Sequence, residues 1–138
     1  MTRPIYENAA SRNAEREVAE FLQQRWNCTL RKLPMAYRVD CALFKGGRLA
    51  GWIEIKCRGK RYPEMFLSLH KYMAGRDLAR ASGVPFLIVY GFSDGGIFSL
   101  KTTDDTPVID IGGRQDRGDW QDVEPMVLLK LADMTPLK

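Results

Sequence analysis

The stretch from Tyr37 to Lys56 constrains the fold most, because its pattern predicts two β-strands joined by a tight turn. The turn falls at Gly46-Gly47, and glycine tolerates the positive φ that tight hairpins require. Successive side chains of a strand point to opposite faces, so the second strand has one polar and one apolar face. The polar face carries Trp52, Glu54 and Lys56, and the apolar face carries Ile53, Ile55 and Cys57.

Two carboxylates and an ammonium group converge on this hairpin. We expect Asp40 on its first strand and Glu54 and Lys56 on its second. Two carboxylates held close together can bind a hard divalent cation, and a lysine beside them can orient or deprotonate a water. The pattern therefore favours a metal-dependent nuclease site. Taken alone it is a weak signal, because an exposed hairpin with an incidental Glu/Lys face would show the same spacing.

The length and composition are typical of one small domain, and we expect residues 1–138 to form a single nuclease-like unit. A chain of 138 residues with 45% hydrophobic residues can bury a core. No run approaches the ~18 apolar residues of a membrane span, and the first ten residues lack the apolar centre of a signal peptide. We therefore expect a protein of the cytoplasm, in a bacterial or phage-infected cell, with no membrane partner.

The cysteines indicate free thiols in a reducing compartment. They are odd in number, lie in apolar contexts and lack the CxxC spacing of metal ligands. A zinc site is not expected, since His70 is the only histidine that could assist them. The residues concerned are Cys28, Cys41 and Cys57.

The charge is distributed unevenly along the chain. Residues 1–72 hold 14 Lys/Arg against 7 Asp/Glu, whereas residues 73–138 hold 7 against 10. The half with the candidate carboxylates is therefore also the basic half, and phosphate neutralisation by such charge supplies most non-specific affinity for nucleic acids. We expect contacts to DNA from Arg38 and from the basic loop that follows the Glu54 strand, at Arg58, Lys60 and Arg61.

Two amphipathic helices are predicted on either side of the hairpin. The first runs from about Asn8, a plausible N-cap, to Trp26, and Glu15 borders its buried stripe. The second runs from Pro63-Glu64 to about Ala81 and ends at Gly83. Lys71 lies one turn from the apolar residues of this second helix, which are Met65, Leu69, Tyr72, Met73 and Leu78.

Shorter strands are predicted around these helices. Residues 28–33 follow the first helix, and residues 85–90 form a central strand that runs parallel to the Glu54 strand after a crossover. Residues 97–101 return as an edge strand, and strands are also expected at 108–111 and 125–131. The glycine-rich segment 112–122 is predicted to be a loop, in which Arg114, Arg117 or Trp120 could touch nucleic acid or a partner.

The order helix, three strands, helix and strand, with Asp…Glu-x-Lys across the hairpin, resembles the PD-(D/E)xK nuclease superfamily. Its stretches NAEREVAEFLQQRW, YRVDCALFKGGRLAGWIEIKCR and HKYMAGRDLARASGVPFLIVY look most like small Holliday-junction resolvases and related phage nucleases. The resemblance covers roughly residues 8–101 and implies the restriction-endonuclease-like α/β fold. That fold has a mixed central sheet flanked by helices, in the order α-β-β-β-α-β. Residues 102–138 would be a C-terminal extension with further β structure.

The resemblance also implies roles for individual residues. Asp40 matches the motif aspartate, Glu54 the second carboxylate and Lys56 the motif lysine, while Val39 stands where the superfamily name has proline. Glu15 falls on the helix glutamate that completes the site in resolvase-like members, and Lys71 falls near a second-helix position that touches the scissile region. The implied cofactor is Mg²⁺, with Mn²⁺ able to substitute. Its ligands would be Asp40, Glu54, Glu15 and the backbone carbonyl of Ile55.

The implied activity is the metal-dependent hydrolysis of DNA by a structure-directed endonuclease, leaving a 5′-phosphate and a 3′-hydroxyl. Two alternatives stay open on the same fold. One is a catalytically silent module that binds nucleic acid, and the other is a phage accessory protein that acts by interaction. A homodimer would suit a nuclease that cuts a junction or a duplex.

Overall fold

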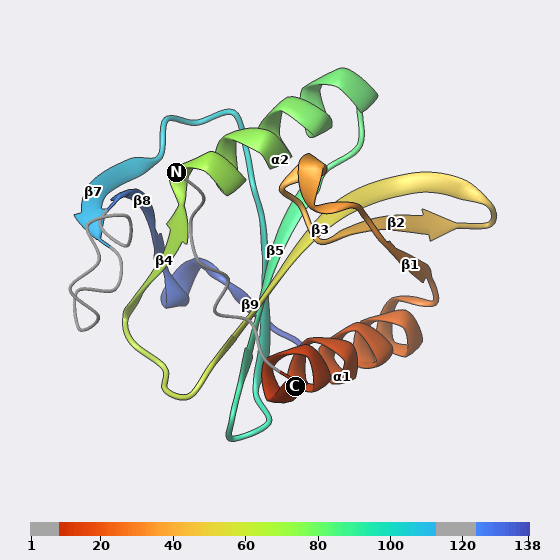
Figure 1. Cartoon of the computed structure of the whole chain (residues 1–138), viewed down its shortest axis with the longest axis horizontal. Coiled ribbons are helices and arrows are strands. Elements are labelled where there is room, and N and C mark those ends of the chain that lie inside the picture. The colour runs from red at the N-terminus through yellow and green to blue at the C-terminus, as the bar shows by residue number, and fades with distance from the viewer. Residues whose placement is uncertain (1–8, 113–123) are drawn as a thin grey trace.

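The structure is a computed structural model that describes residues 9–112 and 124–138, with side chains from Arg12 onward. Within these residues, a six-stranded mixed sheet has helix α1 on one face and helix α2 on the other (Figure 1). A three-stranded antiparallel sheet lies beside it, on the α2 side. This is the restriction-endonuclease-like α/β arrangement that the sequence predicts.

The large sheet has the strand order β1-β2-β3-β5-β6-β9. Its strands are β1 (Thr29–Lys32), β2 (Cys41–Lys45), β3 (Arg48–Arg58), β5 (Phe86–Phe92), β6 (Ile97–Lys101) and β9 (Thr135–Pro136). The small sheet has the order β4-β8-β7, with β4 (Glu64–Ser68), β7 (Val108–Gly112) and β8 (Glu124–Lys130). The helices are α1 (Ala9–Trp26) and α2 (Leu69–Ser82), with short 3₁₀ turns η1 (Met35–Tyr37) and η3 (Leu131–Asp133).

The predicted hairpin is confirmed as β2 and β3. Gly46 and Gly47 both have positive φ, at 56° and 77°, as a tight turn between twisted strands requires. Strand β3 then pairs with β5 in parallel, with α2 in the connection between them, so the predicted crossover is also confirmed. Because β3 is flanked by β2 and β5, the Glu-x-Lys segment lies near the middle of the sheet.

Helix α1 packs closely on the sheet through the stripe that the sequence predicts. Val18 and Leu22 are buried together with Ile53 and Ile55 of β3. The approach is so close that a Cβ on Gly91 of β5 would lie 2.6 Å from a methyl group of Val18. This contact fixes α1 against the middle of the sheet and thereby fixes the position of the acid that α1 carries.

The predicted start of the second helix at Pro63-Glu64 is wrong. Residues 64–68 form β4, in which Met65 and Leu67 are buried while Glu64 and Phe66 are exposed. That alternation has the period of a strand, and the backbone pairs with β8, far away in the sequence. The helix begins at Leu69 instead, and Met73, which was expected in its buried face, is 54% exposed. The end of the helix at Gly83 is confirmed, with a φ of 77°.

The end of the chain is built into both sheets. Strands β7 and β8 confirm the predicted segments and complete the small sheet with β4. Strand β6 was expected at an edge, but the two-residue strand β9 pairs with it, so the prediction is wrong there. The N-cap predicted at Asn8 and the residues Arg114, Arg117 and Trp120 of the predicted loop fall outside the described residues.

Two further expectations concern the described residues only. Within them, no helix has the length and apolar character needed to cross a membrane. Cys28, Cys41 and Cys57 are free thiols, as expected, and burial raises the pKa of the Cys41 thiol to about 12.

Candidate active site

Glu54 is an ionisable group in the core of the protein. Strand β3 turns its side chain to the α2 side of the sheet, beside Ile88 of β5, and leaves it 1% exposed. Lys71 of α2 donates a hydrogen bond of 3.0 Å to Oε2 of Glu54, and the Nζ of Lys56 lies 3.7 Å from the same oxygen. A buried carboxylate is costly unless it is paired, so the two lysines are what allow Glu54 to reside there.

The charged groups of this cluster shift one another's pKa values. Burial raises the pKa of Glu54, and the nearby Asp40 raises it further, against the opposing effect of the two lysines. Burial and the neighbouring Lys71 lower the pKa of Lys56 to about 8. Burial alone would lower the pKa of Lys71, but the Glu54 carboxylate outweighs this and raises it. The cluster therefore holds a carboxyl group with a raised pKa and an amine with a lowered pKa, as groups at functional sites often have.

Asp40 lies one residue before β2, rather than on the strand as expected. Its Oδ2 accepts a hydrogen bond of 2.8 Å from the backbone N–H of Ile55 in β3. Its backbone carbonyl accepts a bond of 2.8 Å from the N–H of Leu33, which extends the pairing of β1 with β2. Since Ile55 stands between Glu54 and Lys56, these bonds hold Asp40 beside the Glu-x-Lys segment.

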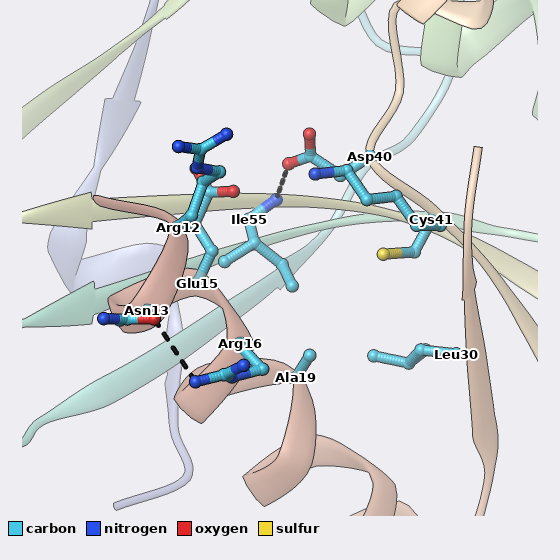
Figure 2. A pocket seen from close by; sticks show the side chains of 10 residues that line it. Arg12, Asn13, Glu15, Arg16, Ala19, Leu30, Asp40, Cys41 and Ile55 are labelled. Atoms are coloured by element: carbon cyan, nitrogen blue, oxygen red, sulfur yellow. Dashed lines mark hydrogen bonds between the residues drawn. The ribbon is translucent and has the colours of Figure 1, made fainter. Parts of the chain in front are cut away.

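A hollow of about 460 Å³ opens beside Asp40 and Ile55, on the α1 side of the sheet. Figure 2 shows it from close by, with the bond between Asp40 and Ile55 and the side chains that α1 contributes. Glu15 of α1 lines the same hollow as Asp40, so the structure brings this predicted residue to the site. The complete lining is Arg12, Asn13, Glu15, Arg16, Ala19, Leu30, Lys32, Asp40, Cys41 and Ile55.

The residues present fit a divalent cation that keeps part of its water shell. Oε1 of Glu54 is buried and has no hydrogen-bond partner among the described residues, which leaves a buried polar oxygen unsatisfied. In the same part of the chain, no three His, Cys, Asp or Glu side chains are grouped closely enough to hold a metal alone. Mg²⁺ does not need such a group, because it commonly binds through one or two carboxylates, waters and substrate phosphates.

Three cations that the sequence analysis did not single out surround the hollow. Arg12 and Arg16 come from α1, and Lys32 comes from the end of β1. The available signal was helical spacing, because residues three and four apart share a face and Arg12 therefore lies over Glu15 and Arg16. Arg16 is oriented by donating a bond of 3.2 Å to the side-chain oxygen of Asn13. Glu15 and Asp40 thus lie in an opening that is rimmed by positive charge.

The geometry agrees with a match between the sequence and a known family. The family model described as "Phage putative PDDEXK endonuclease" matches residues 1–137. The chain belongs to this family. The resemblance to PD-(D/E)xK nucleases that the hairpin motif suggested is therefore confirmed, and the family match extends through the C-terminal strands β7, β8 and β9.

A solved structure from an archaeon shares the fold of this PDDEXK family member. It is Hjc, a Holliday junction resolvase from the archaeal hyperthermophile Archaeoglobus fulgidus. The two chains superpose with a TM-score of 0.62 and 12% sequence identity, over 90% of this chain and 86% of that chain. At this identity the likeness shows the restriction-endonuclease-like fold. No curated protein sequence matches the chain.

The basic residues expected to contact DNA in this PDDEXK protein differ in their surroundings. Arg38, Arg58 and Lys60 are exposed. Arg61 is also partly exposed, but its guanidinium pairs with Asp94 at 3.0 Å and lies over the rings of two phenylalanines. Arg61 therefore fastens the loop after β3 to the turn between β5 and β6, and a phosphate would have to compete with these contacts.

Proposed function

We propose that this PDDEXK family member is a divalent-metal-dependent endonuclease that hydrolyses phosphodiester bonds in DNA at Asp40, Glu54 and Lys56. The observation that carries the proposal is the buried Glu54, held by two lysines next to Asp40 with one oxygen unsatisfied. A protein has little structural reason to bury such a group, because breaking or leaving incomplete a buried polar cluster costs stability. A bound cation would satisfy the remaining oxygen of Glu54, and a phosphate would bind to the cation and the lysines.

The ion would be Mg²⁺, with Mn²⁺ able to substitute, and Asp40 and Glu54 would hold it. The backbone carbonyl of Ile55 and the carboxylate of Glu15 are the further oxygens that the fold brings to this point. A divalent ion at such a site polarises a phosphate and lowers the pKa of a bound water. The lysine contact to Oε2 of Glu54 leaves Oε1 as the oxygen that can serve as a ligand.

Lys56 would act on the attacking water and on the phosphate. Because its pKa is lowered to about 8, its amine can hold or release a proton close to neutral pH. In its protonated form it donates hydrogen bonds to negative oxygens, which stabilises the charge that develops on the oxygens of the phosphate in the transition state. Lys71 orients Glu54 by its 3.0 Å bond and adds a second positive charge beside the reacting group.

DNA would enter along the α1 side of the sheet. Arg12, Arg16 and Lys32 surround the hollow, and exposed basic residues after β3 extend the positive surface. Such charge binds the phosphate backbone without regard to sequence, as a structure-directed endonuclease requires. The phage family and the resolvase fold support a resolvase-like endonuclease that acts inside an infected bacterial cell, and such an enzyme could work as a homodimer.

The test is cleavage of end-labelled duplex, flapped, gapped, single-stranded and four-way-junction DNA of related sequence. Wild-type protein should cleave at least one of these with Mg²⁺ or Mn²⁺ and stop when EDTA is added. Glu54→Gln and Asp40→Asn preserve side-chain shape and should lose activity by roughly 10²–10³-fold, as when one preorganised electrostatic group is removed. Glu20→Gln, at an exposed acid of α1, is the matched control and should cleave like wild type.

Cleavage by Glu54→Gln at the wild-type rate would show that the site is assigned wrongly. The competing function is a silent DNA-binding module on the same fold. A silent module should bind DNA without a metal. It should cleave none of the substrates, even when Mn²⁺ is present.

A further inference from the structure

The turn η1 forms a protrusion directly before Asp40, and its two large side chains point into solvent. Met35 is 82% exposed and Tyr37 is 49% exposed. Single exposed apolar residues are ordinary on protein surfaces, but two large ones on one three-residue turn are less so. This turn also adjoins the residue that we propose as a metal ligand.

The protrusion is held in place at its base and within the turn. The bond between the N–H of Leu33 and the carbonyl of Asp40 closes it, and Val39 is 3% exposed in the core on the α2 side. Within the turn, the N–H groups of Tyr37 and Arg38 donate to the carbonyls of Pro34 and Met35, at 3.1 and 3.0 Å.

The backbone of Arg38, the residue that follows η1, has an unusual conformation. Its φ is 60°, in the left-handed region that a residue with a Cβ seldom occupies. Such a conformation is disfavoured for a residue with a Cβ and is enriched at functional sites. The exposed side chains are therefore presented by a fixed piece of backbone.

The protrusion is short enough to reach only the nucleotides next to the proposed cleavage point. Tyr37 precedes Asp40 by three residues, so their Cα atoms are separated by at most about 11 Å. A DNA strand advances about 3.4 Å per nucleotide. The ring of Tyr37 would therefore meet a base within about three nucleotides of a phosphate bound at Asp40.

The charge around the turn favours a nucleic acid over an apolar protein partner. Residues 21–39 contain four basic residues and no acidic residue. Three of the four, Arg31, Lys32 and Arg38, are exposed close to the turn, and Lys32 also lines the hollow with Asp40. An exposed aromatic ring among cations is the combination on which bases of single-stranded nucleic acids stack.

We propose that η1 is a stacking platform for an unpaired base beside the scissile phosphate. The ring of Tyr37 stacks on the base and the thioether of Met35 packs along its edge. A base inside a continuous duplex is already stacked on both faces, so the platform selects DNA with unpaired nucleotides next to the cut. This inference rests on the proposed function, because it takes the phosphate to lie at Asp40.

Binding without metal tests the platform separately from cleavage. Fluorescence anisotropy in EDTA would compare a duplex that has a short single-stranded gap with a continuous duplex of the same sequence. Wild type should bind the gapped DNA more tightly. Tyr37→Ala should lose about tenfold in affinity for the gapped DNA and less than about twofold for the continuous duplex, whereas Tyr37→Phe should keep the preference. Tyr37 is exposed, so these variants should unfold at the wild-type temperature.

Tyr62→Ala is the matched control, since Tyr62 is 56% exposed on the loop between β3 and β4. It should keep the wild-type ratio of the two affinities. An unchanged ratio in Tyr37→Ala, or an equal loss in Tyr62→Ala, overturns the platform. The platform is also overturned if light scattering shows that the wild type is a dimer and that Tyr37→Ala is a monomer. The turn would then bind a second copy of the chain.

The outcomes also separate this inference from the proposed function. A Tyr37-dependent preference in a protein that cleaves no DNA contradicts the nuclease but keeps Tyr37 as the residue on which an unpaired base stacks. Metal-dependent cleavage without any Tyr37-dependent preference keeps the nuclease and contradicts the platform.

Discussion

The two faces of the central sheet differ in how far the charged groups of the candidate site are exposed. On the α2 side, Glu54 is 1% exposed and is paired with the half-buried Lys56 and Lys71. On the α1 side, Glu15 and Asp40 line an open hollow rimmed by exposed cations. The backbone of Ile55 links the two sides, since it follows Glu54 directly and donates to Asp40.

The difference separates two tasks that a phosphodiesterase has to combine. The closed side keeps an acid and an amine at perturbed pKa values, which requires burial and fixed partners. The open side can admit a polyanion and exchange it for solvent, which requires exposure and positive charge. If this division is right, mutations on the closed side should change stability and chemistry, while mutations on the open side should change affinity for DNA.

The largest effect is expected from Lys71→Met, which removes the closer of the two cations from Glu54. It should lower the free energy of unfolding by about 1–2 kcal/mol, less than for a fully buried pair because Lys71 is 35% exposed. Urea unfolding of the metal-free protein measures this. Lys45→Met, at the exposed end of β2, is the control and should stay within about 0.5 kcal/mol of wild type. Equal stability of both variants would contradict a closed, charge-paired side.

A smaller and different effect is expected from Arg12→Gln combined with Arg16→Gln. The double variant should keep its stability but bind DNA with a weaker salt dependence, its slope of log K against log salt falling in magnitude by about 1–2. Filter binding between low and physiological salt gives the slope. Arg25→Gln, at the far end of α1, serves as the control. If the slope stays at the wild-type value in the double variant, the hollow is not where DNA enters.

The smallest effect concerns pH and isolates Glu54 itself. Its pKa is raised in the folded protein, so the folded state holds this proton more tightly than the unfolded state. Its contribution to stability is therefore complete below the unfolded value near 4.5 and is lost as the pH rises through the folded pKa. The stability of metal-free wild type relative to Glu54→Gln should thus fall as the pH is raised above about 4.5. Urea unfolding at a series of pH values tests the sign, and a rising difference would contradict it.

Much of the large sheet could be predicted because its signals are local. Gly46-Gly47 indicates the hairpin, the helical spacing of apolar residues such as Val18 and Leu22 indicates α1, and the apolar run at 85–90 indicates β5. The parallel pairing of β3 with β5 then follows from the need for a crossover connection. Each of these inferences uses residues that are close in the sequence.

The small sheet shows where local signals fail. Residues 64–68 contain an alternation of only two buried residues, Met65 and Leu67, and continue directly into α2. Pro63-Glu64 is a good start for a helix, so local preference favours extending the helix backward. The strand forms because β8 supplies hydrogen bonds from the distant end of the chain, which no local pattern contains.

The residues of the candidate site also fall into those that a local pattern indicates and those that only the folded structure shows. The motif pattern singled out Asp40, Glu54 and Lys56, and the resemblance added Glu15 and Lys71; the structure brings all five to the two sides of β3, and their roles stay a prediction. Arg12, Arg16 and Lys32 were missed because exposed basic residues are common and only tertiary packing shows which of them face a hollow. For Arg61 the reverse holds, since packing on Phe92 and Phe98 engages a residue that was expected to be free for DNA.

The central claim is that Asp40 and Glu54 hold a divalent cation, and thermal unfolding with and without Mn²⁺ or Mg²⁺ tests it most directly. An ion that binds only the folded state stabilises it by RT ln(1 + [ion]/Kd). Wild type should therefore unfold at a temperature that rises with ion concentration and returns on addition of EDTA. In Asp40→Asn and Glu54→Gln the rise should vanish, while Glu20→Gln should keep it. A rise of equal size in wild type and in both site variants would contradict the claim.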